Sequence, residues 1–372
     1  MTDAGASEFL WYIPNEVRPG HRGDAPAVDH NSLDTLTSHA QALEDNGWKG
    51  ALLGTGWGRP DTFTVATALA ARTTRFEPLI AIRPGYWRPA NFASAAATLD
   101  HLSGGRVRIN VVSGADNLAA YGDSEGDQAH RYGRTREFMR LVRRLWTGED
   151  VTFAGEHFGV AKSTVVPRPV TRGERRHPRL YFGGASDAAE RVAATEADVQ
   201  LFWGEPLDGI AERIDRLRHL SRALDRDLPP LQFGLRITTL VRDTSAEAWR
   251  DAEARVEEMA KAQGQWHDNA RKLAVGQQRL FALQERGEVL DENLYTAPGK
   301  FGGGGAGTTW LVGSAEDVAR SLQKYRELGV TQFVLSDTPY LAEIRRQGTQ
   351  LLPLLRGEGL GGPILIPEQS EV

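Results

Sequence analysis

Short apolar segments alternate with longer amphipathic segments along most of this 372-residue chain. The apolar segments lie at residues 9–14, 50–55, 76–82, 107–112, 179–183, 199–203, 232–241 and 332–336. Residues at alternate positions of a strand face opposite ways, and in these segments both sets are largely apolar. This is typical of strands buried on both faces. The pattern predicts eight buried strands.

Helical periodicity fills the segments between these predicted strands. Helices are expected at about residues 33–46, 62–73, 90–102, 131–147, 186–196, 207–225, 245–262 and 315–328, with another after the last strand. Strands separated by helices indicate a parallel sheet. Eight such units without a change of composition favour an α/β fold, a (β/α)₈ TIM barrel forming a single domain over residues 1–372. The structural rival is a doubly wound open sheet with an appended domain.

Two segments do not fit a plain barrel and are predicted insertions. Residues about 151–178 contain VTFAGEHFGV, which predicts a hairpin turning at Ala154 and Gly155, followed by a loop. Residues about 263–314 precede the last strand and contain GKFGGGGAGTTWLVG. Long segments without regular structure are uncommon in compact domains unless they are functional, so a lid-type insertion is expected here.

Composition removes several functional classes. The formal net charge is −5, and acidic residues are interspersed with the basic ones, so neither a nucleic-acid nor a membrane surface is indicated. The chain has no cysteine, and its nine histidines show no metal-ligand spacing, so no metal site is predicted. The first residues show no basic and apolar leader pattern, and no apolar run is long enough to span a membrane. We expect a cytoplasmic enzyme.

Polar residues that follow the strands are the candidates for chemistry, because barrel enzymes bind at the carboxyl ends of their strands. In YFGGASDAAERVA, Gly184 and Ser186 join a strand to a helix, as in an anion site at a helix N-terminus. The alternative is a tight turn with Ser186 as a simple N-cap. Tyr132 and Arg134 open another helix in HRYGRTREF, where such charges often lie on a solvated face. Together these segments suggest a phosphorylated cofactor.

Two residues point instead to a substrate pocket. Arg236 lies within the apolar run LQFGLRITTLV, and a guanidinium that cannot lose its proton is rarely buried without an anion. Arg236 therefore pairs with an internal carboxylate or binds an anionic substrate. Trp203, at the end of the sixth strand, either packs in the core or forms the wall of an apolar pocket.

These motifs together resemble the bacterial luciferase-like superfamily, and within it the reduced-FMN-dependent alkanesulfonate monooxygenases. The likeness runs from FLWYIPN to QFVLSDTPY. Its main motifs are ATLDHLSGGRVRINVVSG, RYGRTREF, LYFGGASDAA, LFWGEP, FGLRITTLVRDTSAEAW, VGQQR and GGAGTTWLVG.

The resemblance implies a barrel with insertions, assembled as a homodimer or homotetramer. It also implies a flavin monooxygenase that receives reduced FMN from a separate NAD(P)H-dependent flavin reductase. The enzyme would react this FMN with O₂ and oxygenate a small organosulfur substrate, releasing sulfite and an aldehyde.

Site residues follow from the same resemblance. The FMN phosphate would lie against Gly184 and Ser186, with Tyr132 and Arg134 nearby. Asn110 and Ser113 would flank the flavin ring. Arg236 and Trp203 would be the catalytic and substrate-binding residues of the pocket, with Arg236 holding the sulfonate.

Several pocket positions depart from the family pattern. Arg59 stands where a cysteine is common, Thr238 where a histidine is common and Thr338 where a tyrosine is expected, while Asn15 replaces a histidine after the first strand. The arginine that precedes GGAG in the lid is also replaced, by Gly303, which leaves Lys300 as the nearby cation. These departures add Arg59, Thr238, Thr338 and Lys300 to the expected substrate-binding residues.

Three alternatives stay open. YIPN and RPGYWRPA also resemble dimethyl-sulfone monooxygenases, whose substrate carries no charge. A deazaflavin-dependent dehydrogenase on the same barrel would transfer hydride without O₂. A flavin-binding protein without catalysis is the third.

Overall fold

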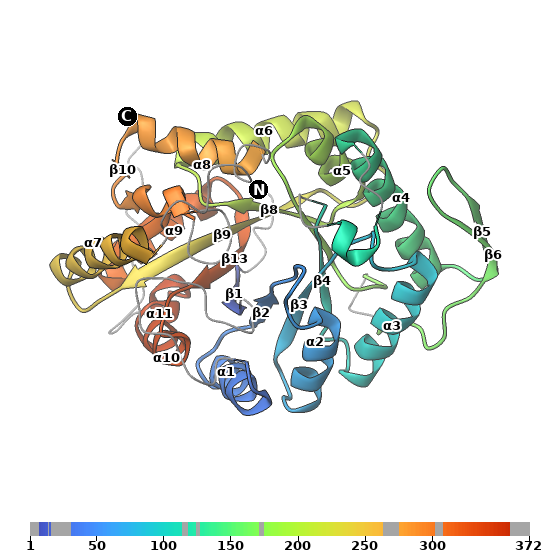
Figure 1. Ribbon diagram of the computed structural model, residues 1–372, viewed down its shortest axis with the longest axis horizontal. Coiled ribbons are helices and arrows are strands. Elements are labelled where there is room, and N and C mark those ends of the chain that lie inside the picture. The colour runs from blue at the N-terminus through green and yellow to red at the C-terminus, as the bar shows by residue number, and fades with distance from the viewer. Residues whose placement is uncertain are drawn as a thin grey trace, which may run out of the picture.

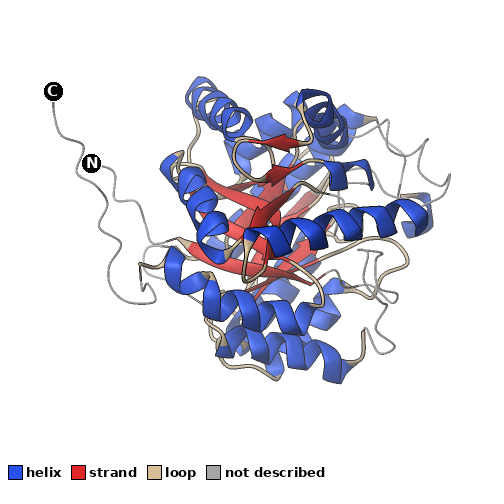
Figure 2. Ribbon diagram, turned by 90° about the vertical axis from the view of Figure 1, so that its left-hand side faces the viewer, coloured by secondary structure: helices blue, strands red, loops and turns tan. Residues whose placement is uncertain are grey.

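The computed structural model contains a closed barrel of parallel strands surrounded by helices (Figures 1 and 2). It describes residues 7–13, 15, 31–113, 118–123, 127–170, 175–262, 275–301 and 308–357. The barrel strands are β1 (Glu8–Ile13), β2 (Gly50–Leu53), β3 (Glu77–Ile82), β4 (Arg108–Val111), β7 (Leu180–Gly183), β8 (Val199–Trp203), β9 (Gln232–Val241) and β13 (Val330–Ser336). Each pairs in parallel with its neighbour, and β9 with β13 closes the circle, so the predicted barrel is confirmed and the open sheet is excluded.

The expected helices follow their strands. They are α1 (Leu33–Asp45), α2 (Thr62–Ala71), α3 (Pro89–Leu102), α4 (Gln128–Thr147), α5 (Asp187–Glu196), α6 (Leu207–Ala223), α7 (Ser245–Ala262), α9 (Ala315–Glu327), α10 (Tyr340–Gln350) and the short α11 (Leu352–Leu355). Polar residues begin several of them: the side chains of Ser32, Asp61 and Asp127 accept the N-cap hydrogen bonds of α1, α2 and α4. In the described part of the chain, no helix is long and apolar enough to cross a membrane.

The first insertion forms a hairpin, as predicted, but its turn spans residues 155–158 rather than Ala154 and Gly155. Its strands β5 (Val151–Ala154) and β6 (Gly159–Ser163) are antiparallel, and they project from one side of the molecule beside α4 (Figure 1). The turn is held by Glu137 of α4, whose carboxylate accepts hydrogen bonds from the amides of Glu156 and His157 at 2.9 and 3.0 Å.

The described part of the second insertion contains regular secondary structure, and its lid role stays a prediction. Its described part holds α8 (Val275–Arg286), β10 (Val289–Leu290), β11 (Leu294–Tyr295), the 3₁₀ helix η2 (Ala297–Phe301) and β12 (Trp310–Gly313). β12 pairs with the second half of β9, and β11 and β10 extend the sheet outward. Apolar packing stabilises this part of the sheet, because Tyr295, Trp310 and Val312 pack with Leu240 in a small separate core. The glycine run at 302–307 lies outside the described residues.

Side chains alternate between the inside and the outside of the barrel. Ile80, Ile109 and Phe333 pack outward against the helices in the large core. Leu10, Leu79, Leu201 and Val334 pack inward in a separate cluster. The residues two positions further along these strands therefore point into the mouth of the barrel.

The opposite, amino-terminal end of the barrel is closed by an ion network. Arg108, whose side chain is 6% exposed, donates to Glu8 at 2.8 Å and to Glu77 at 2.6 Å. It also donates to the hydroxyl of Tyr181 at 2.8 Å. Burial alone would raise the pKa of Glu8, but the hydrogen bond and charge of Arg108 lower it to about 2.

Candidate active site

The carboxyl ends of the strands form the mouth in which most predicted site residues lie. The loop after β2 is fastened there by Asn15, which is 1% exposed and donates to the carbonyls of Gly54 and Pro60 at 3.2 and 2.9 Å. Asn15, which stands at a position where a histidine was expected, is thus engaged in holding two loops together.

The turn after β7 is tight and leads directly into α5. Gly184 has a φ of +152°, and a methyl group on it would lie 2.5 Å from the Cβ of Ala189, so only glycine fits. Ser186 caps α5 by accepting a hydrogen bond from the amide of Ala189 at 3.2 Å. The N-cap interpretation of Ser186 is confirmed, and it leaves the preceding amides of the turn near the helix N-terminus.

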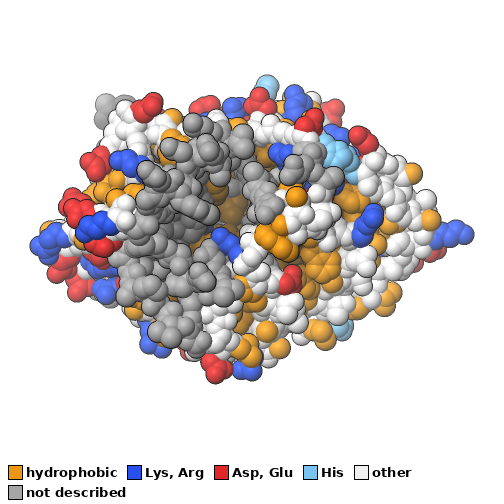
Figure 3. Space-filling model, in the orientation of Figure 1, with side chains coloured by type: hydrophobic (Ala, Val, Ile, Leu, Met, Phe, Trp, Pro, Cys, Tyr) orange, Lys and Arg blue, Asp and Glu red, His pale blue; other side chains and the backbone are white. Residues whose placement is uncertain are grey.

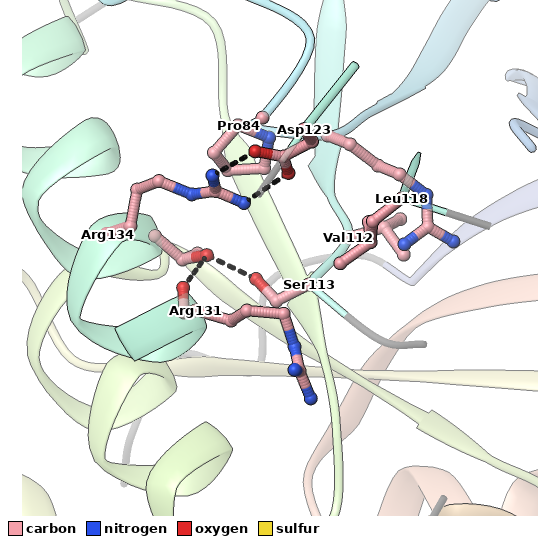
Figure 4. A pocket seen from close by; sticks show the side chains of 10 residues that line it. Pro84, Val112, Ser113, Leu118, Asp123, Arg131 and Arg134 are labelled. Atoms are coloured by element: carbon pink, nitrogen blue, oxygen red, sulfur yellow. Dashed lines mark hydrogen bonds and ion pairs between the residues drawn. The ribbon is translucent and has the colours of Figure 1, made fainter. Parts of the chain in front are cut away.

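Three other predicted cofactor residues lie on neighbouring elements. The ring of Tyr132 packs edge-on against Phe182, and its hydroxyl is 3.8 Å from where a Gly184 methyl would be. Ser113 is hydrogen-bonded to Thr135 of α4 (Figure 4). Asn110 is 8% exposed, and its Oδ1 is buried without a hydrogen-bond partner among the described residues. The structure thus gathers β4, α4 and the β7 turn at one part of the mouth.

Arg134 and Arg131 line one pocket with Ser113, and Arg134 is paired there with an acid (Figure 4). Its two terminal nitrogens donate to the carboxylate of Asp123 at 2.6 and 2.7 Å, and this pair lies over Gly85 (Figure 4). A cofactor-binding role for Arg134 stays a prediction. The bidentate pair with Asp123 gives Arg134 a structural role. In the same pocket Arg131 directs its guanidinium away from this pair (Figure 4).

The substrate side of the mouth is built around Arg236. It is 4% exposed, donates to the hydroxyl of Ser336 at 2.9 Å, and its guanidinium lies 4.5 Å from the ring centroid of Tyr12. Thr238 points to the same side and is 1% exposed. Its hydroxyl has no hydrogen-bond partner among the described residues. A fixed positive charge and a buried hydroxyl therefore stand together.

Trp203 lies directly beside Arg236, because the two are paired in register on β8 and β9. A methyl on Gly276 of α8 would lie 3.3 Å from the Trp203 ring, so the start of α8 packs close to the indole. Two residues further along, Glu205 accepts hydrogen bonds from Arg279 of α8 at 3.0 Å. The second insertion is thereby fixed over the Trp203 side of the mouth.

The other predicted substrate residues are Thr338, Arg59 and Lys300. Thr338 is buried, and its hydroxyl accepts from Arg255 of α7 at 3.4 Å. Arg59 is half-buried on the loop after β2, and Lys300 is exposed at the end of η2. Their substrate-binding roles stay predictions.

The rim of the mouth carries an aromatic group. The strand-end rule points to Trp57 in this group but not to its ring contacts. Tyr86 and Tyr121 stack with ring centroids 3.5 Å apart, and Trp57 meets Tyr121 edge-on at 4.8 Å. Trp57 is 54% exposed. These rings come from three successive loops, so their grouping depends on the closed barrel.

Next to Thr338, a buried ion cluster contains a carboxyl with a shifted pKa. Arg242 contacts Asp337 and Glu343 at 3.3 Å each, and Arg255 contacts Asp337 at 2.8 Å. Burial, reinforced by the charge of Asp337, raises the pKa of Glu343 to about 7.

This shift predicts a pH effect on stability. Between the ordinary pKa of 4.5 and about 7, the folded protein retains a proton on Glu343 that the unfolded chain has lost. The free energy of unfolding should therefore fall as pH rises through this window, by up to roughly 3 kcal/mol. Urea unfolding at pH 5 and pH 7.5 should show a smaller loss in Glu343→Gln than in the wild type. Glu327→Gln, at an exposed position of α9, is the matched control. A loss in Glu343→Gln equal to the wild-type loss would contradict the assignment.

Charge on the face in Figure 3 is mixed, with acidic and basic side chains interspersed around its edge. The described side chains on this face therefore form no single-sign surface.

Comparison with known proteins agrees with this geometry. A long-chain alkane monooxygenase (LadA) superposes with a TM-score of 0.75 and 17% identity, over 97% of this chain and 93% of that one. A riboflavin lyase (RcaE), solved with modified FMN and riboflavin, gives 0.73 and 21%, over 96% and 93%. A coenzyme F420-dependent tetrahydromethanopterin reductase of Methanopyrus kandleri gives 0.66 and 15%, over 94% and 99%. At these identities the likeness establishes the fold alone.

The sequence comparison goes further than the fold. The family model described as luciferase-like monooxygenase matches residues 7–332, which is most of the chain and includes all the barrel strands up to the start of β13. With the barrel and its mouth as described, the expectation of a flavin-dependent enzyme is confirmed, and this chain belongs to the luciferase-like monooxygenase family.

Proposed function

We propose that this protein is the oxygenating component of a two-component system that uses reduced FMN and O₂ to cleave the C–S bond of an organosulfonate. A sulfonate RCH₂SO₃⁻, O₂ and FMNH₂ would give the aldehyde RCHO, sulfite, a proton, FMN and water. The observation that carries the proposal is Arg236, a permanent cation 4% exposed at the mouth of the barrel beside Trp203.

The residues around Gly184 fit the phosphate of FMN. The turn leaves no room for a Cβ, and the N-terminus of α5 favours a negative charge. The buried Oδ1 of Asn110 can accept a hydrogen bond from a flavin ring N–H, with Ser113 beside it. When bound, the reduced flavin supplies the two electrons that activate O₂.

The substrate would be held by its charged head. Arg236 offers two terminal nitrogens in a planar fork, which suits a sulfonate as it suits a carboxylate. Thr238 would add a hydroxyl donor from the same face of β9. Arg59, on the loop after β2, and Lys300, in the second insertion, would supply two further cations. The substrate-binding role of Thr338 stays a prediction. Packing of α8 against Trp203 would keep water from the reacting atoms.

The rim aromatics favour a sulfonate with a planar or apolar body. Trp57 presents exposed ring surface at the entrance, where such a body would lie once the head reaches Arg236. We also propose that a flavin reductase supplies the reduced FMN and that the protein assembles as a homodimer or homotetramer.

A product assay tests the proposal. Purified protein, supplied with reduced FMN by any flavin reductase, should release sulfite from members of a panel of aliphatic and aromatic sulfonates. Dimethyl sulfone and related sulfones serve as the uncharged comparison set. Because Arg236 offers a charge that a sulfone does not need, sulfonates should be turned over with the higher kcat/KM. Turnover of sulfones alone would contradict the proposed substrate class and favour the sulfone alternative.

The F420-dependent neighbour on the same fold keeps hydride transfer as the second candidate function. Anaerobic titrations with reduced FMN and reduced F420 separate the two cofactors. Tighter binding of reduced FMN supports the monooxygenase, and tighter binding of F420 supports the dehydrogenase. Binding of FMN without any product from the panel would favour a flavin-binding protein.

A further inference from the structure

The carbonyl of Gly184 is held by two donors that come from behind the anion turn. Nη2 of Arg213, on α6, donates to it at 2.6 Å, and Nε2 of Gln200, on β8, donates at 3.1 Å. Arg213 is 2% exposed and Gln200 is fully buried. The direction of this one carbonyl is therefore determined by buried side chains.

The direction of the carbonyl determines that of an amide. In a planar trans peptide, the C=O of Gly184 and the N–H of Ala185 point in opposite directions. Because the carbonyl points back to Arg213 and Gln200, the amide of Ala185 points forward, away from them. Among the described residues, the structure records no hydrogen-bond acceptor for this amide.

Arg213 itself has no freedom to turn. Its Nε donates to Glu190 of α5 at 3.2 Å and its Nη1 to Glu205 at 3.0 Å, while the guanidinium lies 4.7 Å from the ring centroid of Phe202. Each nitrogen thus contacts a different segment: α5, the loop after β8 and the Gly184 turn. A planar fork that is fixed at three points keeps one orientation.

The charge of Arg213 is also accounted for. Glu190 and Glu205 are 1% and 3% exposed and both contact Arg213, and Arg216 and Arg279 complete their pairing. Each nitrogen of Arg213 already donates to Glu190, Glu205 or the Gly184 carbonyl, so Arg213 is not the anion's own ligand. It acts through the peptide that it orients.

We propose that Arg213, assisted by Gln200 and held by Glu190 and Glu205, is a positioning residue that directs the Ala185 amide toward the phosphate of the flavin. This inference rests on the proposed function, because it takes the Gly184 turn as the phosphate site. It also assigns one role to Glu205 in the LFWGEP motif and Glu190 in the helix after GGAS, which is to hold Arg213.

The test compares a ligand with a phosphate and one without. Anaerobic equilibrium titrations give the affinities for reduced FMN and reduced riboflavin, and their ratio isolates the contribution of the phosphate. Arg213→Lys keeps the charge but cannot reach all three partners, so the ratio should fall roughly tenfold. Gln200→Met removes only the second, neutral donor, so the ratio should fall about threefold. Riboflavin affinity should change little in both.

Arg226→Lys is the matched control. Arg226 donates to the carbonyls of Ala194 and Ala197 at 3.1 and 2.7 Å, at the other end of α5. Its replacement by lysine should therefore leave the ratio of FMN to riboflavin affinity unchanged. If Arg213→Lys does not fold, Gln200→Met carries the test.

The outcomes separate the two claims. Wild-type protein that binds riboflavin as tightly as FMN would overturn the proposed phosphate site and this inference with it. A wild-type preference for FMN that both variants retain would overturn the inference alone. An equal fall in Arg213→Lys and Arg226→Lys would also overturn it, because a general loosening of α5 would then explain the effect.

Discussion

Arg236→Ala should nearly abolish sulfite release from sulfonates while reduced FMN still binds. The side chain is 4% exposed and contacts Ser336 and Tyr12, and the flavin phosphate is assigned to other strands of the barrel. Removing the anchor of a desolvated, charge-assisted contact costs on the order of 2 to 5 kcal/mol in kcat/KM. Steady-state sulfite assays and anaerobic FMN titrations measure the two quantities separately.

Two further variants should lower kcat/KM by less than Arg236→Ala does. Arg236→Lys keeps the charge but loses the planar fork, so its kcat/KM should lie between those of the wild type and Arg236→Ala. Ser336→Ala removes a partner of Arg236 and leaves the charge in place, so it should have a much smaller effect. Sulfite release that is unchanged in Arg236→Ala would sink the role assigned to Arg236. Thermal unfolding of each variant checks that the barrel is intact.

The largest effect on stability is expected at the opposite end of the barrel. Arg108→Met should lower the free energy of unfolding by about 3 to 5 kcal/mol, because it leaves the carboxylates of Glu8 and Glu77 without their shared buried partner. Arg179→Met is the matched control. Arg179 also contacts Glu8, at 2.7 Å, but its side chain is 23% exposed, so its loss should cost about 1 kcal/mol or less.

The same network predicts a response to acid. The pKa of Glu8 is lowered from 4.5 to about 2, so its contribution is fully present above pH 4.5 and is lost as pH falls toward 2. Denaturant unfolding between pH 5 and pH 2.5 should show a steeper loss in the wild type than in Arg108→Met. Equal slopes would contradict the assignment of Arg108 as the cause of the shift.

Much of the fold was predictable because each barrel strand lies in a largely apolar segment. Buried strands need apolar residues on both faces, and each of the eight predicted segments between residues 9 and 336 overlaps one observed barrel strand. β10 and β11 were missed because two-residue strands leave no periodicity to detect. Their order comes from packing of Tyr295 and Trp310 against β9, which only the folded chain brings together.

Part of the candidate site was also predictable from the sequence. Asn110, Gly184 and Arg236 follow from the rule that strand ends carry the chemistry, and each lies at the mouth. Tyr12 was missed, and the contact of Ser336 with Arg236 was not predicted, because nothing in an apolar strand signals that an aromatic ring or a hydroxyl contacts an arginine on another strand.

Partners across helices were equally hidden. Arg213 belongs to an ordinary amphipathic helix, and its contact with the Gly184 carbonyl exists only through the arrangement of α5, α6 and β8. Arg134 illustrates the converse: its motif suggested an anion ligand, and its contact with Asp123 depends on the path of a loop.

Oxygen dependence tests the central claim most directly. Protein, reduced FMN and a sulfonate substrate are mixed without oxygen, then a known amount of O₂ is added, and sulfite and oxidised flavin are measured at each step. We expect no substrate loss before O₂ is added, and afterwards close to one sulfite for each flavin oxidised on the enzyme. Substrate loss without O₂, or flavin oxidation that never yields sulfite, would contradict the account.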